Sequence, residues 1–105
     1  MKLATFVVST PVGQIQRIGA IHQNRIIDLN MGYTRYLADK HGNSEAYELA
    51  LAILPTDMIS FFRRGEEGKE KAEISIDYVA RYQAKDGLLG PRGEKLVYEM
   101  GEVKL

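Results

Sequence analysis

Short blocks of hydrophobic residues in the first thirty positions are typical of β-strands. Residues 3–8 are apolar and partly β-branched, and polar turn residues follow them. Residues 15–22 predict a second strand, with apolar side chains on one face at a period of two. The pair Gln23-Asn24 fits a tight reversal, because Asn tolerates positive φ better than most residues. Residues 25–29 therefore predict an antiparallel return strand.

From Asn30 onward the apolar residues follow a helical spacing instead. The pattern predicts a first helix that is capped by Asn30 and stopped by Gly42 in the left-handed conformation. A second helix carries an apolar stripe and ends before Pro55. We therefore expect two consecutive helices to follow the strands.

A third, short helix is predicted after Thr56, which fits the N-cap position. Arg63 and Arg64 occupy its last turn, where they complement the helix dipole. Its predicted buried face consists of Met58, Ile59 and Phe62. A fourth helix is predicted from about residue 66 to about residue 83.

The C-terminal part of the chain returns to β structure. Residues 90–93 are rich in Gly and Pro and predict a turn, and residues 95–98 predict a last strand. We therefore predict an α+β fold. A small antiparallel β-sheet, built from the N-terminal strands plus a C-terminal strand, packs with about four α-helices. Residues 1–105 are expected to form a single domain.

Composition narrows the range of functions. The chain has 105 residues, of which 45% are hydrophobic and 27% charged, and its 14 basic residues balance 14 acidic ones. Binding to nucleic acid or to an anionic membrane surface is therefore not expected, because both need a surplus of Lys and Arg. The chain has no cysteine, which excludes disulfides and thiolate metal sites. No apolar run approaches the ~20 residues of a membrane helix, so a soluble, cytoplasmic protein is expected.

Catalytic motifs are not recognisable in the sequence. The acidic residues are scattered and include no Glu-x-Glu pair, and His22 and His41 do not share a metal-binding spacing. No Gly-x-Ser-x-Gly elbow surrounds any serine. We therefore expect no catalytic, cofactor-binding or metal-ligating residues in these 105 positions.

The tyrosines are the most suggestive side chains. They are amphipathic, and several are expected on neighbouring helices or one helical turn apart, an arrangement that suits a surface which buries against a partner. The alternative is that they form a half-buried rim of the core. The residues concerned are Tyr33, Tyr36, Tyr47, Tyr78 and Tyr82.

Several stretches together resemble the N-terminal part of bacterial and archaeal fumarylacetoacetate hydrolase family proteins. These stretches are residues 1–6, 17–21, 24–30, 54–62 and 101–105. The resemblance implies a larger catalytic domain after residue 105, in which a Glu-x-Glu pair and an Asp hold Mg²⁺, Mn²⁺ or Ca²⁺. That metal would act as a Lewis acid on 2-oxo or β-dicarbonyl acids, in C–C hydrolysis, decarboxylation or keto–enol isomerisation. None of its ligands lies in this chain.

The expected function is therefore that of a non-catalytic N-terminal accessory domain. Its partner would be its own catalytic domain, which it packs against and helps to position, and a homodimer is a further expected association. The alternative is a free-standing protein–protein interaction module with no enzymatic role. The sequence leaves open the substrate, the reaction subtype and whether 105 residues form the whole gene product.

Overall fold

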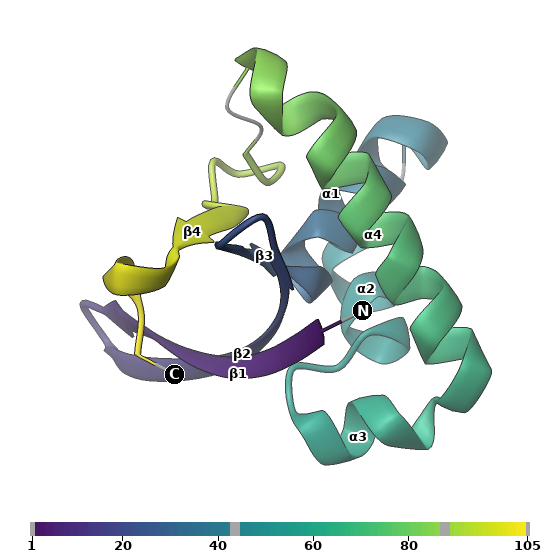
Figure 1. The fold of residues 1–105 in the computed structure, drawn as a ribbon. Helices are drawn as coiled ribbons and strands as arrows, with labels where there is room; N and C mark the ends of the chain where they lie inside the picture. The colour runs from purple at the N-terminus through teal and green to yellow at the C-terminus, as the bar shows by residue number, and fades with distance from the viewer. Residues whose placement is uncertain (1, 43–44, 87–88, 105) are drawn as a thin grey trace.

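The computed structural model describes residues 2–42, 45–86 and 89–104 and has an α+β fold, as predicted (Figure 1). Within these residues three strands come first, four helices follow, and a short strand and a 3₁₀ turn come last. The elements are β1 (Lys2–Thr10), β2 (Gly13–His22), β3 (Arg25–Asp28), α1 (Leu29–His41), α2 (Ala46–Ile53), α3 (Met58–Arg63), α4 (Gly65–Asp86), β4 (Val97–Glu99) and η1 (Met100–Glu102).

The four strands form one antiparallel sheet in the order β1-β2-β3-β4. Strands β2 and β3 are joined by Gln23 and Asn24, whose φ angles are 52° and 63°. Two consecutive positive φ angles are the signature of the tight hairpin turn that matches strand twist. The predicted reversal at these residues is therefore confirmed.

The sheet curls until its two edges approach each other (Figure 1). The backbone N of Val7 in β1 donates to the carbonyl of Lys104 at 2.7 Å, so the end of the chain joins the first strand. Gly19 allows the tight curl, because a Cβ at this position would lie 2.3 Å from Ile26 Cγ2 and 2.9 Å from Phe6 Cε1. Phe6 and Ile26 are fully buried and fill the inside of the curl.

The helices cover the opposite face of the sheet (Figure 1). Ile18 and Ala20 of β2 are buried there against Leu29 and Tyr33 of α1. Burial of these apolar side chains supplies the main favourable free energy of folding. The described helices thus shield one side of the sheet.

The boundaries of α1 differ from the prediction at one end. Gly42 has φ 54° and ends the helix as expected, but the N-cap is Asp28 rather than Asn30. Asp28 Oδ1 accepts a hydrogen bond from the backbone N of Met31 at 3.1 Å. The side chain of Asn30 instead donates to the carbonyl of Leu54, at 2.9 Å, and so ties α1 to the end of α2.

Candidate functional site

Helix α3 is held in place by hydrogen bonds at both ends. Asp57 Oδ2 accepts from the backbone N of Ser60 at 2.9 Å, and this bond holds the pKa of Asp57 below its ordinary value. The N-cap is therefore Asp57 and not the predicted Thr56, because the extended backbone of Asp57 lets its carboxylate reach the first turn. At the other end the backbone N of Arg64 donates to the carbonyl of Phe61 at 3.0 Å, and α4 begins at the next residue, Gly65, whose φ is 60°.

The prediction of which side of α3 is buried is wrong. Phe61 is the buried side chain, at 4% exposure, whereas Ile59 is 69% exposed and Phe62 is 65% exposed. Gly68 of α4 explains the difference. A Cβ at Gly68 would lie 3.3 Å from the carbonyl O of Phe61 and 2.7 Å from Arg64 Cβ. Only glycine therefore lets α4 approach α3 closely enough to bury Phe61.

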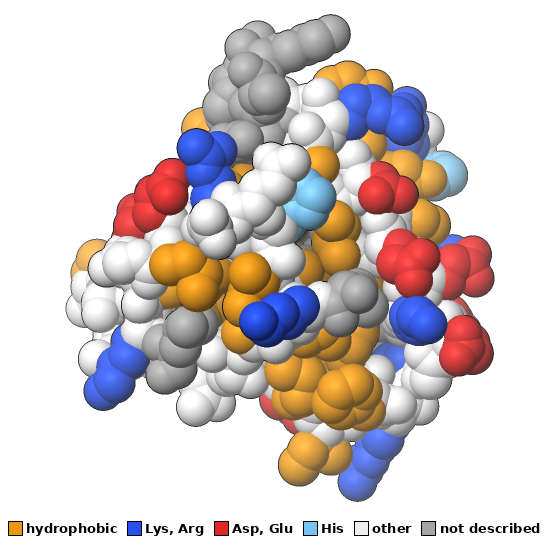
Figure 2. Space-filling view, in the orientation of Figure 1, with side chains coloured by type: hydrophobic (Ala, Val, Ile, Leu, Met, Phe, Trp, Pro, Cys, Tyr) orange, Lys and Arg blue, Asp and Glu red, His pale blue; other side chains and the backbone are white. Residues whose placement is uncertain are grey.

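The exposed side of α3 forms an apolar surface, which we call the α3 face. Figure 2 shows hydrophobic side chains gathered over α3. Ile59 and Phe62 project from the helix, and Phe62 also lines a groove of about 420 Å³. The residues that line the groove are Leu3, Phe61, Phe62, Gly65 and Lys69. Contiguous apolar patches of this kind mark interaction surfaces more often than isolated apolar residues do.

Four of the five predicted tyrosines form a row between α1 and α4. The ring of Tyr33 stacks on Tyr36 at a centroid distance of 5.6 Å. Tyr36 and Tyr78 form a T-shaped pair at 5.4 Å, and Tyr78 contacts Tyr82 at 4.8 Å. Tyr33 is buried, and the other three are half-buried. The hydroxyl of Tyr78 donates to Asp39, and burial together with this acceptor raises the pKa of Tyr78 to about 12.

Tyr47 lies apart from this row. Its hydroxyl donates to Glu94, and the guanidinium of Arg92 lies over its ring at 4.5 Å. Burial raises the pKa of Tyr47, and the bond to Glu94 adds to that effect. Tyr33 therefore belongs to the core, and the hydroxyls of Tyr47 and Tyr78 have partners within the chain. A partner-facing role of the half-buried tyrosines stays a prediction.

A buried ion pair joins β2 to β3, and sequence reasoning missed it. The Arg17 guanidinium donates to both carboxylate oxygens of Asp28, and its Nη2 also donates to Asn30 Oδ1 at 3.1 Å. Burial raises the pKa of Asp28, while the adjacent Arg17 opposes the shift. The only sequence signal for Asp28 is its position immediately before a helix, which fits an N-cap. That signal does not indicate a pairing with Arg17.

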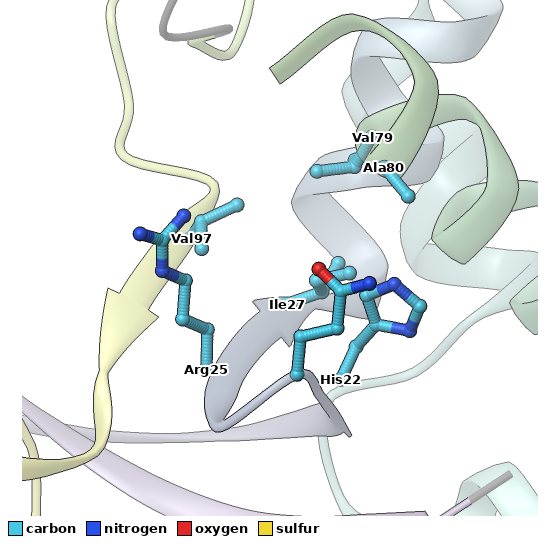
Figure 3. Close-up of a pocket in the computed structure, with 7 residues that line it drawn as sticks. His22, Arg25, Ile27, Val79, Ala80 and Val97 are labelled. Carbon is cyan, nitrogen blue, oxygen red and sulfur yellow. The ribbon is translucent and has the colours of Figure 1, made fainter. Parts of the chain in front are cut away.

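His22 is placed at the junction of two cavities beside α4. One cavity, of about 260 Å³, lies between the β2–β3 turn, β4 and α4 (Figure 3). The other, of about 300 Å³, lies on the other side of His22 and includes Lys2, Glu73 and Asp77 in its lining. The imidazole of His22 is half-buried, so it is accessible from both cavities.

The second histidine, His41, contacts the ring of Tyr36 at 6.0 Å near the end of α1. Among residues 2–42, 45–86 and 89–104, no three His, Cys, Asp or Glu side chains are grouped closely enough to hold a metal ion. In the same described residues, no helix has the length and apolar character needed to cross a bilayer.

Comparisons of the chain with protein-family models, with curated proteins and with solved structures find no match.

Proposed function

We propose that this chain is a non-catalytic accessory domain that packs on the catalytic domain of a fumarylacetoacetate hydrolase-like enzyme and helps to position it. The enzyme would use a divalent metal and act on 2-oxo or β-dicarbonyl acids. The observation that carries the proposal is the α3 face, where two large apolar side chains, Ile59 and Phe62, lie exposed and Phe62 lines a groove.

The energy available at this face suits a domain contact. Complete burial of a large apolar side chain contributes about 1.5–3 kcal/mol. Ile59 and Phe62 stay largely exposed when this chain folds. Their burial against a partner would therefore contribute a few kcal/mol to binding. Interfaces between domains of one chain commonly bury about 600–1,500 Å², and a short helix with a groove beside it fits within such an area.

The partner that covers the α3 face is inferred from the sequence resemblance. The stretch at residues 54–62, which contributes to it, also contains Ile59 and Phe62 of the α3 face. In the family that the chain resembles, the segment following this domain carries the metal ligands. We therefore propose that the catalytic domain covers the α3 face and that the metal is held by that domain alone.

The first test reads the coding sequence beyond the codon for Leu105. The proposal expects an open frame with a Glu-x-Glu motif and a further Asp for the metal. A stop codon at that point would overturn the proposal and favour the free-standing interaction module, which would use the same apolar face to bind another protein.

The second test uses the full product of that reading frame. The double change Ile59→Ser and Phe62→Ser is expected to lower turnover of an acylpyruvate and to leave the bound-metal content unchanged. Leu51→Ser is the control, because Leu51 is also an exposed apolar residue, at 55%, but lies on α2 and not on the α3 face. Equal effects of the two changes would contradict a specific role for the α3 face.

A further inference from the structure

We propose that the cavity between the β2–β3 turn and α4 binds a small monocarboxylate with a short apolar chain. The cavity has a volume of about 260 Å³ and shares none of its lining with the groove beside α3. The inference is therefore independent of the docking role proposed above. Its lining residues are His22, Gln23, Arg25, Ile27, Val79, Ala80 and Val97.

The floor of the cavity is apolar because two layers of the fold meet there. Ile27 of β3 and Val79 of α4 lie beneath the floor at 3% and 0% exposure, and the half-buried Val97 of β4 packs against them and supplies accessible apolar surface. Ala80 on α4 completes this wall (Figure 3). The small side chain of Ala80 leaves room that a larger residue would occupy. A short hydrocarbon chain would lose contact with water at this floor.

The rim of the cavity supplies hydrogen-bond donors. Figure 3 shows Arg25 on one side, next to Val97, and His22 on the opposite side, with α4 across the opening. Gln23 belongs to the turn between them and contributes a carboxamide. A guanidinium, an imidazole and a carboxamide all donate hydrogen bonds, and none of the described lining residues carries a carboxylate. This set favours an anionic acceptor.

Arg25 keeps donors available for a ligand. Its Nε contacts Glu99 Oε1 at 3.1 Å, and the side chain is 48% exposed. Glu99 is 61% exposed, so the pair is an open surface contact that competes weakly for the guanidinium. Arginine binds carboxylates through two parallel N–H donors, which a single contact at Nε does not use up.

The size of the cavity limits the ligand. Pockets for drug-sized molecules occupy about 300–1,000 Å³, so a cavity of 260 Å³ suits a smaller molecule. One carboxylate at the rim and a chain of a few carbons over the floor satisfy both the donors and the apolar wall. We therefore use butyrate as the probe and butanamide as its uncharged counterpart.

The test is a titration of the ¹⁵N-labelled chain with sodium butyrate, followed by amide chemical shifts. We expect saturable shifts that are confined to the cavity residues, and binding of butanamide about tenfold weaker, because it lacks the charge that strengthens the bond to Arg25. Arg25→Gln should weaken butyrate binding about tenfold. Ala80→Leu should abolish it by filling the cavity without a change in charge.

Arg81→Gln is the matched control. Arg81 is an exposed neighbour of Ala80 on α4 and does not line the cavity, so its loss should leave butyrate binding unchanged. The spectrum of each variant reports directly whether it is folded. Three results would overturn the proposal: no shifts at all, unsaturable shifts spread over the charged surface, or equal weakening by Arg25→Gln and Arg81→Gln.

Discussion

At the scale of single residues, the buried pair between Arg17 and Asp28 has the strongest expected effect on stability. Asp28 is 2% exposed, so removal of the cation leaves its carboxylate buried with only backbone hydrogen bonds, such as the one from Met31 N, to stabilise it. Arg17→Met is expected to lower the free energy of unfolding by about 3–5 kcal/mol in urea denaturation. Arg25→Met, which removes an exposed pair on the next strand, should cost less than about 1 kcal/mol. Similar costs for both changes would contradict this view of the network.

Tyr78 provides a second test at this scale. Its pKa is raised from an ordinary 10.0 to about 12 by burial and by the bond to Asp39. Since the folded state favours the neutral phenol, this group's contribution to stability is present below pH 10.0 and is lost as the pH rises toward about 12. An ultraviolet titration should show a late phenolate that Tyr78→Phe removes and Asp39→Asn shifts to lower pH. Titration of every tyrosine near its ordinary pKa would refute the assignment.

At the scale of elements, α3 gives a paired prediction. Phe61→Ala should destabilise the chain by about 3–5 kcal/mol, because it empties a buried site beside Gly68. Phe62→Ala should change stability by only about 0.5 kcal/mol, because most of that ring is already in water. Thermal melting of the two variants side by side measures the difference. A larger loss of stability for Phe62→Ala than for Phe61→Ala would contradict this, and would support the predicted orientation of α3 in which Phe62 is buried.

The contact between α1 and α4 depends on a glycine. A Cβ at Gly32 would lie 2.4 Å from Ser75 Oγ and 2.9 Å from Val79 Cγ2, and Ser75 Oγ donates to the carbonyl of Leu29 at 2.8 Å. Gly32→Ala should therefore cost about 1–3 kcal/mol in chemical denaturation. Gly101→Ala is the control, since a Cβ there meets open space. A neutral Gly32→Ala would show that the two helices can separate freely.

The comparison of sequence with structure shows which elements local patterns predict. The hairpin at Gln23 and the end of α1 at Gly42 follow from local backbone preferences, so both could be predicted. Helix α3 has six residues, of which four are apolar, so periodicity alone does not show which side is buried. The buried side of α3 is determined by the close approach of Gly68 of α4, which is a tertiary contact.

At the scale of the whole molecule, long-range contacts could not be predicted from local sequence patterns. The pairing of Val7 with Lys104 joins the two ends of the chain, and no local pattern indicates it. The same holds for the cavity beside His22, which depends on where Val79 and Ala80 of α4 lie relative to the β2–β3 turn. The α+β class was predictable, because it requires only the order and type of the elements. The surfaces available for binding were not.

The central claim is that the α3 face contacts a catalytic domain, and a photo-crosslink tests it most directly. Phe62 is replaced by a photoreactive phenylalanine analogue in the full product of the gene, and the crosslinked peptides are identified by mass spectrometry. The account predicts crosslinks from position 62 to the domain that carries the Glu-x-Glu motif, and none from the same analogue at the exposed control position Arg81. Crosslinks from position 62 that stay within residues 1–105, or an absence of crosslinks, would contradict it.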